Sequence, residues 1–95
     1  MEYKIKRIIH SGSRGTRGID RTDGRYPLRI GRTVDLNLSD IKIGCPMILK
    51  YLKNADGSDY SNMFLKTSNV VGIHGVDELF ACIETVNSIF EFERA

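Results

Sequence analysis

Hydrophobic and polar residues alternate along much of this chain, and a period of two is typical of β-strands with one buried face. The clearest case is residues 33–38, where Val34, Leu36 and Leu38 share one face. Turn residues such as glycine, proline, asparagine and aspartate separate the alternating segments. The pattern predicts seven further strands, at residues 3–9, 25–30, 47–53, 62–67, 70–74, 78–85 and 88–93.

Three of these segments carry features that refine the prediction. In the first, Tyr3, Ile5 and Ile9 share an inner face, and lysines occupy the other face. The second contains Pro27, which cannot donate a hydrogen bond to a neighbouring strand and therefore predicts an edge strand. The segment that begins at Met47 is apolar on nearly both faces, which predicts a central strand.

The last stretch of the chain fits two structures. A helix is one alternative, because apolar residues also recur at the helical spacing of Leu79, Ile83, Val86 and Phe90. We favour a β-hairpin, since the stretch is rich in β-branched and aromatic residues and Asn87 beside Ser88 suits a two-residue turn. Phe90 and Phe92 then face inward.

The predicted fold is all-β, a small single-domain barrel or curved sandwich of about 6–8 short antiparallel strands, SH3-like or OB-like. Residues 1–95 form one domain, because a chain of this length supports one hydrophobic core. Residues 10–24 stand apart, with repeated glycines, several arginines and one large apolar residue, Ile19. They predict a flexible basic loop, longer than most connections in small domains.

The composition argues against a membrane or secreted protein. The longest wholly apolar run, Leu79–Ile83, is far shorter than the ~20 residues that a membrane-spanning helix needs. The first residues alternate charged and apolar side chains, unlike a secretory signal. We therefore expect a cytoplasmic protein that does not bind membranes, with Cys45 and Cys82 as reduced, mostly buried thiols.

The charge is strongly asymmetric along the chain. Residues 1–32 carry nine cationic and three anionic side chains, whereas residues 33–95 carry five and nine. Such asymmetry predicts an anionic partner, either nucleic acid or an acidic protein. Most of the cations are arginines, whose planar guanidinium groups match phosphate well. The candidate binding residues are Lys4, Lys6, Arg14, Arg17, Arg21, Arg25, Arg29 and Arg32.

The six candidate arginines recur at helical spacing, but a helix through them would contain four glycines and Pro27, at a cost of roughly 7 kcal/mol. We therefore expect Lys4, Lys6, Arg25 and Arg29 to lie on outward strand faces as a preformed group, with the loop joining on binding. The alternative is a self-neutralising surface, in which the basic third lies against the acidic residues Glu78, Glu84, Glu91 and Glu93.

No catalytic, cofactor-binding or metal-ligating motif is apparent. His10 beside Ser11 lacks the sequence of a nucleophile elbow, which leaves a hydrolase only as a remote alternative. The histidines and cysteines lack the paired spacing of zinc ligands. The predicted function is a non-enzymatic binding module for nucleic acid or another anionic partner. The alternative is a protein-interaction or assembly subunit, acting through a strand edge or as an oligomer, with no role in nucleic-acid binding.

Overall fold

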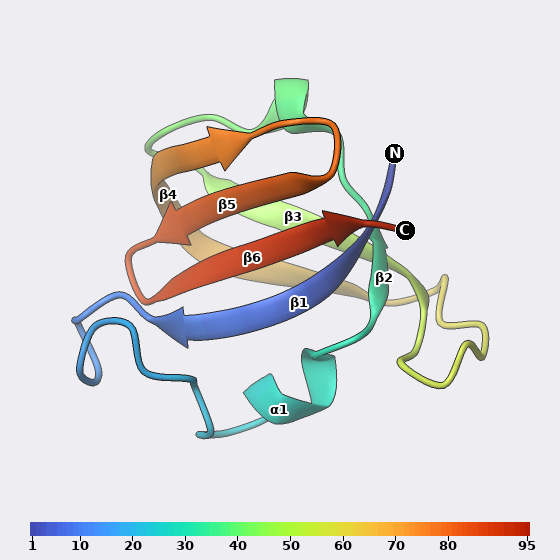
Figure 1. The fold of residues 1–95 in the computed structure, drawn as a ribbon, viewed down its shortest axis with the longest axis horizontal. Helices are drawn as coiled ribbons and strands as arrows, with labels where there is room; N and C mark the ends of the chain where they lie inside the picture. Colours follow the sequence, from blue (N-terminus) through green and yellow to red (C-terminus); the bar gives the residue numbers. More distant parts are fainter.

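The computed structural model describes residues 1–95 and shows six antiparallel strands closed into a barrel (Figure 1). The prediction of a small all-β barrel is confirmed. No helix is both long and apolar enough to cross a membrane. In chain order the elements are β1 (Glu2–His10), α1 (Tyr26–Arg29), β2 (Thr33–Asp35), the 3-10 helix η1 (Leu38–Asp40), β3 (Pro46–Lys53), β4 (Phe64–Val76), β5 (Phe80–Thr85) and β6 (Ser88–Arg94).

Strands that follow one another in sequence are neighbours in the barrel, and β6 completes the ring by pairing with β1. In this closing pair Ile5 lies opposite Phe92, and both side chains are fully buried. The amide of Ala95 donates a hydrogen bond to the carbonyl of Glu2 at 3.1 Å. The two chain ends therefore lie side by side, as Figure 1 shows.

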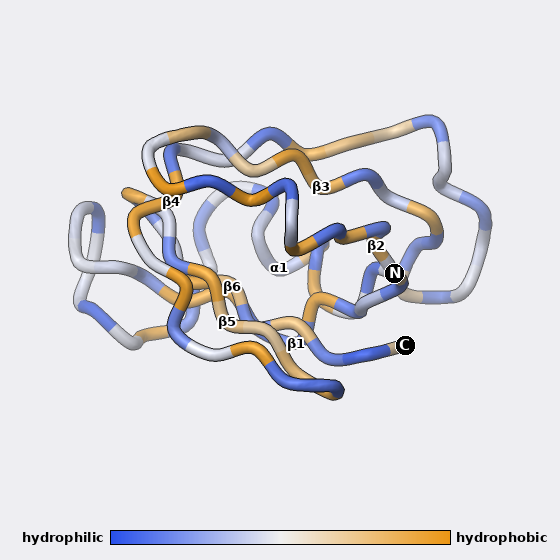
Figure 2. Tube along the Cα trace, turned by 90° about the horizontal axis from the view of Figure 1, so that it is seen from above, coloured by the Kyte–Doolittle hydropathy of each residue, from blue (hydrophilic) through white to orange (hydrophobic).

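The inward faces of all six strands form one hydrophobic core. Figure 2 shows the hydrophobic and hydrophilic residues alternating along the strands, which is the pattern that places every second side chain inside the barrel. The core consists of Tyr3, Ile5, Ile8, Val34, Leu36, Met47, Leu49, Tyr51, Val70, Ala81, Ile83, Phe90 and Phe92.

The predicted C-terminal hairpin is confirmed, and its helical alternative is wrong. Strands β5 and β6 are joined by residues 86–87, the two residues that the predicted strands 78–85 and 88–93 leave between them. The Thr85 hydroxyl closes the turn by donating to the Ser88 carbonyl and accepting from the Ser88 amide. Phe90 and Phe92 face inward as expected, with their rings stacked at a centroid distance of 6.0 Å.

Strand β1 buries one more residue than the alternation predicts. The register with β6 shifts between Ile5 and Arg7, which marks an irregularity in the pairing. Beyond this point the alternation of inward and outward side chains shifts, so Ile8 is buried as well as Ile9, whose burial was predicted. A bulge of this kind adds a residue to one strand, and a strict period of two does not reveal it.

The predicted edge strand at residues 25–30 is wrong, because the segment forms the four-residue helix α1. Pro27 lies in its first turn, where a missing N–H costs nothing and the fixed φ favours a helix. The chain leaves α1 at Gly31 with a φ of +87°, and the Gly31 amide donates to the Ile5 carbonyl at 2.8 Å. A Cβ at Gly31 would lie 3.1 Å from that of Ala55.

The strands in the middle of the chain differ from the prediction at their ends. Strand β2 stops at Asp35, and Leu38 begins η1, where the Asn37 side chain accepts a hydrogen bond from the Ser39 amide. Because Asn37 caps a helical turn, the inward alternation does not extend to Leu38, which is only half-buried.

Strand β3 pairs with β2 on one side and β4 on the other, so it lies between two strands as predicted. Only its inner face is buried, however, and Ile48 on the outer face is 52% exposed. Strand β3 forms an antiparallel hairpin with the strand that follows it. However, the strands predicted at residues 62–67 and 70–74 are one continuous strand, β4. Its first half pairs with β3 and its second half with β5.

Candidate nucleic-acid interface

Arg17, one of the predicted binding residues, is neutralised by a carboxylate of the barrel. Its guanidinium donates two hydrogen bonds to Glu84 on β5, at 2.7 and 2.9 Å. His74 lies on the other side of the same carboxylate, with Nε2 2.6 Å from Oε1. The hydrogen bond from Arg17, with a smaller contribution from His74, lowers the pKa of Glu84 to about 2. Arg17 therefore fastens the loop to β5.

Arg21 is also used within the fold. Only 5% of this residue is exposed, and its guanidinium donates to the Ser88 hydroxyl at 2.8 Å. It forms an ion pair with Asp23, whose pKa falls to about 2 mainly because of that hydrogen bond. Its other face stacks on the Tyr26 ring, 3.8 Å from the centroid. Two arginines of the loop thus have fixed partners, while the flexibility of residues 10–24 stays a prediction.

Three further candidates, Lys4, Lys6 and Arg14, are exposed and have no ion-pair partner. Lys4 lies opposite Glu93 in the pairing of β1 with β6. Lys6 lies over the Phe80 ring, with Nζ 5.0 Å from the centroid. The predicted self-neutralising surface is therefore present in part: Arg17 pairs with Glu84, Arg7 lies 4.0 Å from Glu91, and Glu93 lies next to Lys4.

The remaining candidates, Arg25, Arg29 and Arg32, lie together. They line a cleft of about 180 Å³ between α1 and the β3–β4 hairpin. In Figure 1, α1 lies below the barrel and the turn of the β3–β4 hairpin lies at its lower right. We call this the arginine–aromatic cleft; its other lining residues are Leu28, Tyr51, Tyr60, Met63, Phe64 and Leu65.

The predicted preformed group is thereby divided. Arg25 and Arg29 line the arginine–aromatic cleft, whereas Lys6 lines a different hollow, formed by β1 with Pro27 and Ile30. Lys4 lines neither. Because residues 25–30 form a short helix instead of a strand, their arginines do not continue the outer face of β1.

The positive charge of the cleft is not compensated. No carboxylate lines it, and no ion pair of the chain includes Arg25, Arg29 or Arg32. Aromatic rings contact two of the three guanidinium groups instead, those of Arg29 and Arg32. The Cζ atom of Arg32 lies 4.6 Å from the centroid of Tyr60 and 5.0 Å from that of Tyr51. Cation–π contacts of this kind position a guanidinium without neutralising its charge.

The backbone of Arg32 is fixed from two directions. Its amide donates to the carbonyl of Arg29 at 3.2 Å, and its carbonyl accepts from the amide of Ile5 at 2.9 Å. Arg32 thus connects α1 to the barrel wall, which points its side chain into the cleft beside the hairpin. The site is built before any partner binds.

Two buried polar atoms of the cleft have no hydrogen-bond partner in the protein. They are the Nε of Arg32 and the hydroxyl of Tyr51, a residue only 3% exposed. Buried polar groups nearly always have a partner, because leaving one without costs about 1–3 kcal/mol. Arg32 and Tyr51, which we call the floor of the cleft, therefore have hydrogen-bonding groups that the protein itself does not use.

Tyr51, Tyr60 and Phe64 were missed as site residues by the sequence analysis. In the sequence they lie 19 or more positions from Arg32, within a hairpin whose alternation indicates only strands and a turn. The pairing of β3 with β4 and the path of α1 bring them to the arginines. No local sequence pattern indicates that these rings meet the arginines. The only signal is a weak one: three aromatic residues lie in or near one polar turn and could form a cluster of rings.

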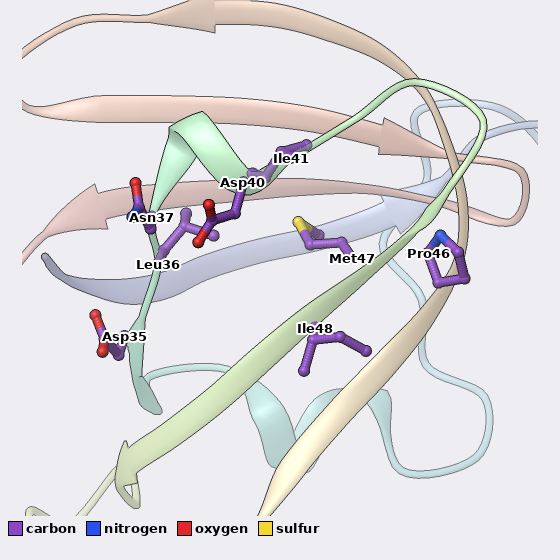
Figure 3. Close-up of a pocket in the computed structure, with 8 residues that line it drawn as sticks. All are labelled: Asp35, Leu36, Asn37, Asp40, Ile41, Pro46, Met47 and Ile48. Carbon is purple, nitrogen blue, oxygen red and sulfur yellow. The ribbon is translucent and has the colours of Figure 1, made fainter.

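A larger hollow, of about 360 Å³, lies between η1 and the start of β3 (Figure 3). Asp35 and Asp40 line it, and Asp35 forms an ion pair with the N-terminal ammonium group at 3.0 Å. Asn37 already accepts hydrogen bonds within η1. With carboxylates and no cation in its lining, this hollow is a poor match for an anionic partner.

The residues around His10 do not assemble a nucleophile. The Ser11 hydroxyl donates to the carbonyl of Val86 and the Ser13 hydroxyl donates to Asn87, so neither is directed at His10. No group of three or more histidine, cysteine, aspartate or glutamate residues lies close enough together to hold a metal ion.

No protein-family model, curated protein or solved structure matches this chain.

Proposed function

We propose that this protein is a non-enzymatic module that binds single-stranded nucleic acid through the arginine–aromatic cleft. The observation that carries the proposal is the cleft itself: three arginines with no acidic partner lie beside aromatic rings. A guanidinium group matches the oxygens of a phosphate, and an aromatic ring offers a surface for a base. Both features of a nucleic acid are thus met at one place.

The aromatic residues favour a single strand over a duplex. Phe64 is 64% exposed at the mouth of the cleft, and Tyr60 is half-buried behind it. A base can stack on such a ring only when it is not already stacked within a duplex, as in single strands. Lys50 lies opposite Phe64 on the outer face of the β3–β4 pair and extends the positive charge.

The size of the cleft argues against a free cofactor. Pockets for small molecules have volumes of roughly 300–1,000 Å³. At about 180 Å³ the arginine–aromatic cleft is smaller, and it suits one chemical group of a larger partner. A polymer whose remaining groups lie on the surface beyond the cleft fits this geometry.

Fluorescence anisotropy with labelled oligonucleotides of about 12 nucleotides tests the proposal. We expect single strands to bind more tightly than a duplex of the same sequence, with an affinity that falls steeply as salt increases. Three phosphate contacts on a single strand correspond to a slope of about −2 in log K against log salt.

The variants Arg29→Ala and Arg14→Ala remove the same charge and serve as a matched pair. Arg29→Ala is expected to reduce the slope by about 0.7, and Arg14→Ala to leave it unchanged, because Arg14 does not line the cleft. If the protein fails to bind oligonucleotides at low salt, or binds with equal slopes in both variants, the proposal is wrong.

One observation favours the second candidate function, an assembly subunit. Several large apolar residues are 44–62% exposed on the second half of β4 and the turn to β5, namely Val71, Ile73, Val76, Leu79 and Phe80. Patches of this kind often mark protein contacts. Light scattering over a concentration series separates the two: a mass that stays that of one chain removes the support for self-assembly.

A further inference from the structure

The floor of the arginine–aromatic cleft contains two of the three buried polar side-chain atoms that have no partner in the chain, the Nε of Arg32 and the hydroxyl of Tyr51. The third, Nδ1 of His10, lies at the end of β1 and outside the cleft. The two atoms belong to separate elements, the link after α1 and strand β3, yet both residues line the same cleft. A single partner that reaches both atoms would explain why both lack a hydrogen bond within the chain.

Both atoms need an acceptor. The Nε–H of arginine can only donate a hydrogen bond, and the hydroxyl of a neutral tyrosine donates readily. The other polar groups of the cleft are the guanidinium groups of Arg25, Arg29 and Arg32 and the hydroxyl of Tyr60, and it holds no carboxylate. An acceptor from outside the chain that carries negative charge matches both these atoms and the three guanidinium groups of the cleft.

The kind of phosphate follows from the shape of the site. A phosphate within a nucleic-acid chain has two ester links, so its strand would have to pass through a buried floor in both directions. A terminal phosphate enters end-on, and it has three free acceptor oxygens and a charge of about −1.5 to −2 at neutral pH. Only the terminal group brings acceptor oxygens to both floor donors while the strand leaves through the mouth.

We propose that the cleft floor binds the terminal phosphate monoester of a single strand, with Arg32 and Tyr51 donating to its free oxygens. The inference rests on the proposed function and adds a preference for one end of the strand. Arg25 and Arg29 neutralise the rest of the charge, and the first base lies against Phe64 at the mouth. No bond is made or broken.

The test uses three oligonucleotides of one sequence, labelled internally, that end in a 5′-phosphate, a 3′-phosphate or hydroxyl groups only. One of the two phosphorylated strands is expected to bind about tenfold more tightly than the hydroxyl-ended strand, as one additional charge-assisted contact provides. Inorganic phosphate at millimolar concentration is expected to reduce this advantage.

Two variants assign the effect to the floor. Tyr51→Phe removes one donor, and Arg32→Lys removes the Nε–H while keeping the charge. Each is expected to abolish most of the tenfold preference, measured within one variant as the ratio of its affinities for the phosphorylated and the hydroxyl-ended strand. Tyr3→Phe is the matched control, because Tyr3 is equally buried on β1 and lies outside the cleft. It should retain the full preference.

The outcomes separate the two proposals. Equal binding of all three strands overturns the end preference and leaves the proposed function intact. Absence of binding by every strand overturns both. Tighter binding of a phosphoserine peptide than of any oligonucleotide would assign the monoester site to a phosphorylated protein, which also overturns the inference as stated.

Discussion

Two neighbouring parts of the basic third contain the same residue type and use it in opposite ways. In the loop, Arg17 is paired with Glu84 and Arg21 with Asp23, so their charges stabilise the fold. In residues 25–32 the three arginines have no acidic partner and line a cleft. The difference lies in which carboxylates each segment meets, since Glu84 faces the loop from β5 while the β3–β4 hairpin presents aromatic rings to the cleft.

The comparison shows that a count of charges along a sequence does not give the charge available to a partner. An arginine in a bidentate pair with a carboxylate presents almost no net field, and breaking the pair to bind phosphate would lose the first interaction. An arginine against a tyrosine ring keeps its charge. The net charge of residues 1–32 therefore overstates the binding surface, which is concentrated in its last third.

The largest expected effect is on the affinity for an oligonucleotide, and it distinguishes the cleft from the loop. The double variant Arg25→Ala/Arg29→Ala should weaken binding of a single-stranded oligonucleotide by roughly 30- to 100-fold, because two phosphate contacts are lost. The double variant Arg14→Ala/Arg17→Ala removes the same charge and should change the affinity by less than twofold. Anisotropy titrations at one salt concentration measure both, and equal losses would break the comparison.

The next effect concerns stability and applies to the loop. Glu84→Gln removes the acceptor shared by Arg17 and His74, and we expect the melting temperature to fall by about 5 °C. Glu78→Gln is the control, because Glu78 has the same chemistry without a hydrogen-bond or ion-pair partner. Melting curves followed by circular dichroism compare the two, and a Glu84→Gln protein as stable as the control would contradict a structural role for Arg17.

The acid sensitivity of the protein should come from the loop as well. The pKa values of Glu84 and Asp23 fall from ordinary values of 4.5 and 3.8 to about 2, chiefly through their bonds to Arg17 and Arg21. A lowered pKa in the folded protein contributes stability that is complete above the ordinary value and is lost as the pH falls through the folded value. Melting temperatures should therefore decline between about pH 4.5 and 2.

The same pH series on Glu84→Gln sharpens this prediction. The variant lacks one of the two carboxylates, so its melting temperature should depend less on pH over that range than that of the original protein. Parallel curves would show that the Glu84 carboxylate does not contribute to acid sensitivity, and that other groups account for the decline.

The smallest expected effect has the opposite sign and applies to the cleft. Tyr51→Phe removes a buried hydroxyl without a partner and should leave the free energy of unfolding unchanged or raise it by about 1 kcal/mol. Tyr3→Phe is the control again, since the Tyr3 hydroxyl is not among the buried atoms without a partner. Chemical denaturation measures both; a clear loss of stability in Tyr51→Phe would mean that its hydroxyl already has a partner.

Much of the fold could be predicted from the sequence, because a half-buried strand leaves a period of two that is local to a few residues. This was sufficient for Tyr3 and Ile5 of β1, for the buried Val34 and Leu36, and for the C-terminal hairpin with Phe90 and Phe92 inside. It failed at residues 25–30, where apolar and charged residues alternate but a single helical turn forms around Pro27. Four residues are too few for a helical period to be seen.

The site could be predicted only in part. The arginines were identified by charge, yet the sequence does not report that Arg17 meets Glu84 across 67 positions, or that Arg32 meets Tyr60. Such contacts depend on strand register and on the direction of a turn, which arise only in the assembled barrel. The sequence therefore predicted an anionic partner, whereas the fold was needed to show which cations have no acidic partner within the chain.

The pairing of β1 with β6 has a consequence for the time course of folding. Tyr3 lies opposite Arg94, so the contact that closes the ring joins residues from the two ends of the described chain. Contacts of such long sequence separation form slowly, and all-β barrels typically fold in milliseconds to seconds. Before β6 pairs with β1, the Arg32 carbonyl can already accept its hydrogen bond from the Ile5 amide. The barrel is then still open between β1 and β6. We therefore expect the hairpins β3–β4 and β5–β6 to form before the pairing of β1 with β6.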